Sequence, residues 1–428
     1  MHGNSSQSPP LFDAESRQQL HRHPDLWFDD GSVICRAQNT LFRVHMSQLG
    51  RHSVCFRDVF SVGSFTDPVT SSSIVQEDGS SAFGDSPIIV LHDSAEDVGN
   101  LLTALYDGPN FGNNDREDFR MVSGILRLST KYIIEHLREK ALAHLSIAWP
   151  TTLKSWDARE DAARIFEMES GTYSGHFYPS PIAVINLARQ INAPSLLPAA
   201  FYDLSRYPFS QIFDPDEDDP LYVSPPPDTE PCSSSSSSHS SLSHLDTQHL
   251  CLGKEAAQHT ITNMIQAMGN SQSVRNSTHF QATFSLSHPL ATPNMVNPYA
   301  PPGHHHHHHN LQHHRRSSSN LICISAAACR KDFNELVDLA TQHYIFDRER
   351  GCCDPLYVAE ELGQLKSSEF SNSDAPECKA CARNLELWAA KERERIWKVI
   401  PVWFGLDHSP NTSTAGSDGT RSPPVVEV

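Results

Sequence analysis

Cysteines in the last quarter of the chain are the residues whose spacing points most directly to a chemistry. Cys378 and Cys381 have the C-x-x-C spacing that can place two thiolates on one tetrahedral zinc ion. Other possible ligands lie upstream of this pair: Cys323, Cys329, His343, Cys352 and Cys353. A strong zinc signature has two well-spaced pairs, and adjacent cysteines are a poor second pair. Two interpretations stay open: a structural zinc at Cys378 and Cys381, or thiols that only pack between helices, which we favour because cysteine is often buried.

Two further clusters lie in a segment of biased composition. The six histidines at 304–309 could bind metal, but drift of low-complexity sequence is the simpler explanation. Arg315-Arg316-Ser317-Ser318 resembles a site for a basophilic kinase, with Ser318 as the candidate phosphorylated residue.

The sequence offers little for catalysis. The motifs G-x-S-x-G, H-E-x-x-H, G-x-x-x-x-G-K-[ST] and G-x-G-x-x-G are absent. His45 could be taken for a catalytic base, but a partly buried histidine hydrogen-bonded in a core is the simpler interpretation. We therefore expect no enzymatic activity and no cofactor other than the zinc considered above.

Composition narrows the class of protein. The 428 residues include 33 Lys plus Arg and 51 Asp plus Glu, a net charge of −18, which argues against binding nucleic acid through global charge. The apolar fraction of 38% is below the roughly 45–50% usual for compact domains, so part of the chain should be unstructured. No secretory signal and no run approaching the ~18–20 apolar residues of a membrane span is visible. We expect an intracellular protein, cytoplasmic or nuclear, with no membrane partner and with its cysteines as thiols.

The N-terminal part predicts an α/β domain over residues 25–146, preceded by a flexible tail over 1–24 in which a short helix at 14–21 is possible. Within the domain, alternating apolar residues predict strands over 32–38 and 40–45. The remaining elements follow in order: a helical pattern over 46–60, a loop over 61–85, a buried strand over 87–91, a helix over 94–106 and two more helices.

The rest of the chain predicts helical regions separated by a linker. Residues 147–222 show helical spacing. Residues 223–320 read as a disordered linker rich in Ser, His and Pro, with a transient helix over 251–268. A C-terminal helical region follows over 321–405, with a long helix that Pro401 ends, and then a disordered tail over 406–428.

The predicted domain resembles the BTB/POZ fold over about 120 of the 428 residues. After two short strands, BTB domains commonly have H-x-x-x-L-x-x-x-S-x-x-F-x-x-x-F, and the chain has His45, Leu49, Ser53, Phe56 and Phe60 at these spacings. Further residues that match the BTB pattern or its core lie in the two strands, at Val33 and Phe42. Others lie in the helix that ends in Tyr-Asp-Gly, at Leu101, Leu102 and Tyr106. Many BTB domains have an aspartate thirteen residues before the histidine, where this chain has Ser32, so the family's charged co-repressor groove is not implied.

The remainder resembles fungal BTB proteins, through Leu196 to Arg206 and through the C-x-x-C pair followed by Trp397 to Pro401. The resemblance implies a non-enzymatic scaffold or adaptor that self-associates or binds protein partners. One alternative is a substrate adaptor of a cullin-type ubiquitin ligase, for which Val75-Gln76-Glu77 has the hydrophobic-x-Glu form found in some cullin-binding BTB domains. Another is a transcriptional co-regulator without a DNA-binding module of its own.

Overall fold

A computed structural model describes most of the chain: residues 10–62, 74–76, 80, 82–83, 86–171, 177–215, 221, 241–269, 326–346, 351–364 and 378–406. The histidine run, Ser318 and Glu77 lie outside these residues. The chain divides into two compact units, residues 1–250 with 404–428, and residues 251–403.

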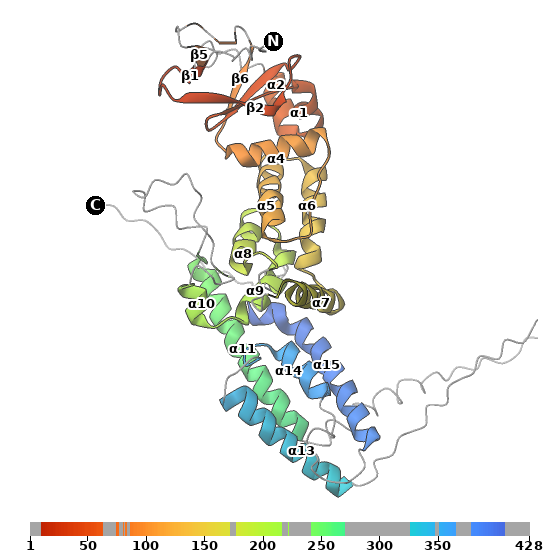
Figure 1. The fold of residues 1–428 in the computed structure, drawn as a ribbon. Helices are drawn as coiled ribbons and strands as arrows, with labels where there is room; N and C mark the ends of the chain where they lie inside the picture. Colours follow the sequence, from red (N-terminus) through yellow and green to blue (C-terminus); the bar gives the residue numbers. More distant parts are fainter. Residues whose placement is uncertain are drawn as a thin grey trace, which may run out of the picture. The chain divides into compact units, whose positions relative to one another are not determined.

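The first unit begins with a six-stranded sheet (Figure 1). Its strands are β1 (Leu11–Asp13), β2 (Gln19–Trp27), β3 (Val33–Ala37), β4 (Thr40–Val44), β5 (Ile74–Gln76) and β6 (Ile88–Leu91). They lie in the order β5-β1-β2-β4-β3-β6, with parallel pairing of β2 with β4 and of β3 with β6, and antiparallel pairing elsewhere. Because parallel neighbours need a crossover connection, the chain between β3 and β6 has room for the helices that follow β4.

The hairpin β3–β4 confirms the two strands predicted over 32–45. Its turn falls at Gln38, whose φ of 49° is in the left-handed region that a tight turn requires. Both strands bury nearly every side chain, since β3 lies between β4 and β6 inside the sheet. Apolar residues of four further strand segments complete one core cluster: Leu11, Leu20, Ile34, Leu41, Ile74 and Ile88.

The residues before this hairpin differ from the prediction of a flexible tail with a short helix at 14–21. The structure has β1 and β2 there, joined by a turn. Asp13 explains the turn, because its Oδ1 accepts hydrogen bonds from the backbone N–H groups of Glu15 (3.0 Å) and Ser16 (2.7 Å). Such local side-chain bonds compete with helix formation.

The sheet is accompanied by α1 (Met46–His52), α2 (Val54–Val62), α4 (Ala95–Tyr106), α5 (Arg116–Lys131) and α6 (Glu135–Ala148). The single helical pattern over 46–60 is in fact two helices, because Ser53 ends one and caps the other. α4 packs against β2 and α5, and α5 packs against α6, which lies beside it in Figure 1. The α/β domain predicted from the sequence is thereby confirmed at the level of fold class.

The first unit continues with helices in the region predicted to be helical. They are α7 (Leu153–Ser170), α8 (Pro181–Gln190), the 3₁₀ turn η2 (Pro194–Leu196), α9 (Leu197–Ser205) and α10 (Phe209–Phe213). α8 packs against α9 and α5, and α7 packs against α6.

The predicted disordered linker is interrupted by α11 (His244–Gly269), a helix of 26 residues whose first part belongs to the first unit. Leu250, Ala257, Ile261 and Ile265 are buried at helical spacing, so this segment has an apolar face that its polar surroundings in the sequence conceal. The remainder of residues 223–320 lies almost entirely outside the described residues.

The second unit contains the rest of α11 together with α13 (Ala326–Thr341), the π-helical turn η4 (Gln342–Phe346), α14 (Pro355–Gln364) and α15 (Lys379–Trp403). α14 packs closely against α15. The prediction that Pro401 ends the last helix is wrong, because α15 includes it and continues to Trp403. A proline in a helix lacks the N–H for one hydrogen bond and crowds the preceding turn, and here both effects fall within the last turn. Across the helices that the structure describes, none is long and apolar enough to cross a membrane.

Candidate functional site

His45, the first residue of the BTB-like motif, is held by two partners at the end of β4. The Tyr106 hydroxyl oxygen accepts a hydrogen bond from the His45 backbone N–H at 3.0 Å and lies 2.8 Å from Nδ1. The other ring nitrogen, Nε2, lies 3.2 Å from the carboxylate of Asp30, so both nitrogens of the His45 ring have a polar partner. Burial raises the pKa of Tyr106, so its hydroxyl stays protonated and serves as a link between β4 and the end of α4.

Ser53, the third residue of the motif, ties two parts of the domain together. Its Oγ accepts a hydrogen bond from the backbone N–H of Phe56 (3.0 Å), which caps α2, and donates one to the carbonyl oxygen of Tyr132 (2.6 Å) at the end of α5. Phe56 stacks on the Tyr132 ring with centroids 4.7 Å apart. Ser32, at the position of the family's aspartate, accepts a hydrogen bond from the backbone N–H of Met46 at 2.9 Å.

The other motif positions form the apolar interior. Phe60 is half-buried and stacks on Phe56, while the remaining members are buried: Val33, Phe42, Leu49, Leu101 and Leu102. The polar motif residues thus join elements of the fold.

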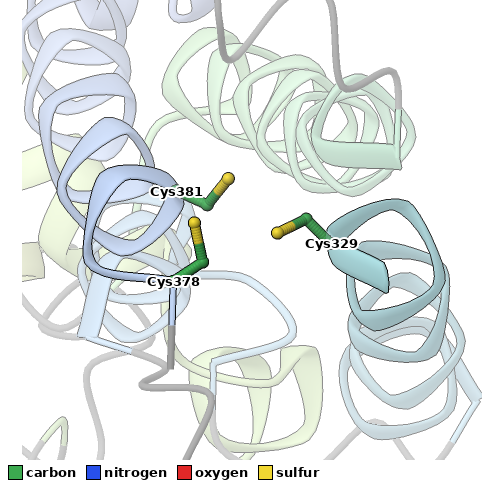
Figure 2. Close-up of side chains that lie close together, drawn as sticks. All are labelled: Cys329, Cys378 and Cys381. Atoms are coloured by element: carbon green, nitrogen blue, oxygen red, sulfur yellow. The ribbon is translucent and has the colours of Figure 1, made fainter. Parts of the chain in front are cut away.

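In the second unit, the two cysteines of the C-x-x-C pair meet a third. Cys378 directly precedes α15, Cys381 lies in the first turn of α15, and Cys329 lies on α13. Their Sγ atoms all lie within 4.8 Å of one another. Figure 2 shows the three side chains pointing into the space between the two helices. Cys329 and Cys381 are buried and Cys378 is half-buried, so the group is open to solvent on one side only.

In the sequence Cys329 is only one of several possible ligands, and the structure brings it to the C-x-x-C pair in place of the adjacent pair Cys352 and Cys353. The Sγ atoms of that pair lie 3.7 Å from each other, and Cys353 accepts a hydrogen bond from Gln258 Nε2 at 3.6 Å. Neither belongs to the group of three.

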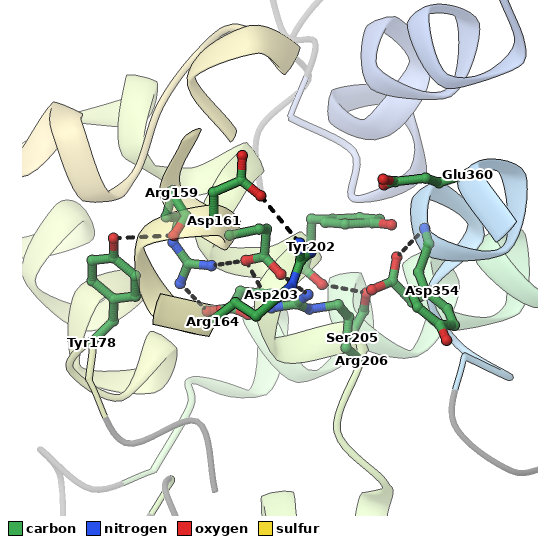
Figure 3. A network of polar contacts seen from close by, with 12 residues as sticks. Arg159, Asp161, Arg164, Tyr178, Tyr202, Asp203, Ser205, Arg206, Asp354 and Glu360 are labelled. Carbon is green, nitrogen blue, oxygen red and sulfur yellow. Dashed lines mark hydrogen bonds and ion pairs between the residues drawn. The ribbon is translucent and has the colours of Figure 1, made fainter. Parts of the chain in front are cut away.

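Sequence reasoning missed a buried charge network in the first unit. Arg159 on α7 donates to Glu160 (2.5 Å) and to Asp203 on α9 (2.6 Å), and Arg206 donates to the same two carboxylates at 2.7 and 2.5 Å. Burial opposes ionisation of Glu160, but Arg206 and Arg159 together hold its pKa at about 2. Figure 3 shows Arg159 between Tyr178 and Asp203. Charged residues within an otherwise apolar helical run, such as Asp203, were the available signal.

This network is a structural feature rather than a reactive one. The guanidinium of Arg159 lies 4.9, 4.7 and 4.4 Å from the ring centroids of Trp149, Trp156 and Tyr178. A guanidinium enclosed by aromatic rings and paired with carboxylates links α7 to α9 through Asp203.

Comparison with known proteins adds no family to these observations. No protein-family model matches the chain, and the search of curated proteins gave no match.

Proposed function

We propose that the chain is a non-enzymatic protein-interaction adaptor whose N-terminal α/β domain is the docking module, as the resemblance to BTB/POZ domains implies. The observation that supports this most is the order and pairing of its elements. The hairpin β3–β4 is followed by α1 and α2, then by β6 in parallel beside β3, then by α4 and the helical pair α5 and α6.

The roles of the motif residues support the same proposal. The polar groups of His45 and Ser53 make hydrogen bonds that connect strands and helices. Such structural roles are expected of a module that offers a binding surface to a partner protein. Function in such a module comes from burying apolar and backbone groups against a partner.

A second copy of the chain is the partner we propose first. The helix at 14–21, which in dimeric BTB domains packs across the two-fold axis, is absent here because those residues form the turn after β1 and the start of β2. The outer strands β5 and β6 are the remaining places where the sheet can be extended, and Val90 on β6 is 42% exposed.

Sedimentation velocity of the full chain at tens of micromolar tests self-association, with a dimer or larger species expected. Val90→Lys places a charge on the outer strand, and Ile147→Lys places the same charge on α6, where the side chain is 66% exposed. We expect only Val90→Lys to shift the chain toward monomer. A wild-type chain that sediments as a monomer would refute self-association.

Affinity purification with mass spectrometry separates the other partners. Recovery of a cullin would favour the ubiquitin-ligase adaptor, and recovery of chromatin proteins would favour the co-regulator. Val75 and Gln76 lie in β5, the outer strand that pairs with β1. A cullin that bound these residues would therefore contact this edge of the sheet.

A further inference from the structure

We propose that Cys329, Cys378 and Cys381 bind one zinc ion that joins α13 to α15 in the second unit. The proposal is independent of the N-terminal domain and of its partner.

The geometry of the three sulfur atoms is close to that of a zinc site. Zinc binds thiolates at about 2.3 Å, so two thiolates on a tetrahedral ion lie about 3.8 Å apart. The Sγ atoms here lie within 4.8 Å of one another. An ion at their centre therefore requires movements of about 1 Å at most, which small rotations of the side chains about χ1 supply.

The start of α15 holds two of the ligands at a fixed spacing. The carbonyl oxygen of Cys378 accepts hydrogen bonds from the backbone N–H groups of Cys381 (2.9 Å) and Ala382 (3.1 Å). The first turn of the helix is therefore formed, and residues three apart lie on the same side of it. The positive end of the helix dipole also favours thiolates at this position.

Packing alone explains the burial of these thiols but not their convergence. A packed thiol needs apolar neighbours, whereas these sulfur atoms come from two helices and approach one another. Without a cation the three groups would be neutral thiols, because three thiolates this close would repel strongly. A divalent ion removes that repulsion, and zinc is the redox-inactive ion that thiolate ligands select.

The described residues supply three of the four ligands that a tetrahedral ion takes. The ion would fasten residue 329 to residues 378 and 381 across the intervening chain.

Metal content is the first test. The full chain is purified under reducing conditions without a nickel column, with the histidines at 304–309 replaced by serine so that they do not bind ions. We expect about one zinc per chain and no stoichiometric iron or copper. Cys329→Ser and Cys381→Ser should each lower the zinc content several-fold, whereas Cys352→Ser, a change of the same type in the same unit, should leave it unchanged.

Alkylation of the wild-type chain measures the reactivity of each cysteine without any substitution, so misfolding of a variant cannot affect the result. The metal-free chain is treated with iodoacetamide with and without added zinc sulfate, and each cysteine is followed by peptide mass spectrometry. We expect zinc to protect Cys329, Cys378 and Cys381 and to leave the exposed Cys251 reactive.

Hydrogen exchange of the same samples reports on the link between the helices. Amide hydrogens of α13 and of the start of α15 exchange when these segments open. Zinc at a free concentration 100 times its dissociation constant should slow this exchange about 100-fold. Zinc content below about one ion per ten chains, after zinc addition and dialysis, would overturn the proposal. So would equal protection of Cys251 and the three proposed ligands, or iron or copper bound in place of zinc.

Discussion

Replacing Arg159 by methionine should destabilise the contact between α7 and α9 by about 3–5 kcal/mol, the range for removing one partner of a buried ion pair. The side chains of Arg159 and Asp203 are only 3% and 5% exposed. Methionine keeps an apolar, polarizable side chain against Trp149, Trp156 and Tyr178, so the change isolates the loss of charge.

The magnitude follows from the charge balance of the network. Two arginines and two carboxylates make it neutral, and loss of Arg159 leaves two carboxylates with Arg206 alone. In the variant only Arg206 still opposes the effect of burial on Glu160, so the site either keeps one uncompensated negative charge or takes up a proton, and both cost free energy. A matched control lies on the same helix. Arg164 pairs with Asp161, but the two side chains are 63% and 67% exposed, so Arg164→Met should cost no more than about 1 kcal/mol.

Hydrogen exchange with mass spectrometry measures both effects in the full chain, because it reports opening free energies for peptides of α7 and α9 separately. A global melting curve would mix the two units. The double variant Arg159→Met with Asp203→Leu restores neutrality and should cost less than the sum of the two single changes. If Arg159→Met costs no more than Arg164→Met, the charge network does not hold these helices together.

Three further predictions concern the N-terminal domain. Phe56→Ala and Leu102→Ala should each lower its stability by about 2–5 kcal/mol in denaturant titrations followed by exchange of its peptides, because both side chains are buried; a loss below about 1 kcal/mol would contradict their placement. Burial opposes ionisation of Asp13, but hydrogen bonds from Ser16 and Arg36 hold its pKa at about 2, below its ordinary 3.8. Its contribution of about 2 kcal/mol should therefore be present above pH 4 and lost as the pH falls toward 2, a loss that circular dichroism should show to be smaller in Asp13→Asn. Gly124→Ala would place a Cβ in steric conflict with Asp97 Oδ1 and should cost about 1–3 kcal/mol in thermal melts, whereas an unchanged melting temperature would show that Asp97 moves aside freely.

The elements that the sequence predicts correctly are those whose pattern is local. The alternation of Val33, Cys35 and Ala37 and the helical spacing over 94–106 each depend on a single period, and β3 and α4 follow them. The helix at 14–21 fails for the opposite reason. Residues 19–27 are strand because β1 and β4 pair with them, and pairing of this kind is invisible to a local pattern.

Composition averaged over a long segment predicts a disordered linker with only a transient helix over 251–268, whereas the structure has the longer helix α11 there. The serine run at 233–238 and the histidine run at 304–309 dominate the average, but the residues between them include 26 that form a helix. An apolar face at helical spacing was present in the sequence, at Leu250, Ala257 and Ile261. A helix of this kind gains its stability from packing, which composition alone does not measure.

In the three-cysteine group, the sequence predicts one contact from local spacing, and the other contacts depend on the tertiary fold. The spacing of Cys378 and Cys381 is local, because three residues on a helix bring two side chains to one side. Cys329 is far from them in sequence, with α14 between, and only the folding of α13 toward α15 makes it their neighbour. The adjacent pair Cys352 and Cys353 is nearer in sequence and yet does not join the group. Which cysteine becomes the third ligand depends on the direction in which its helix approaches the pair, and sequence distance does not decide it. Thiols that face one another from two helices should therefore be tested for bound metal before their burial is attributed to packing alone.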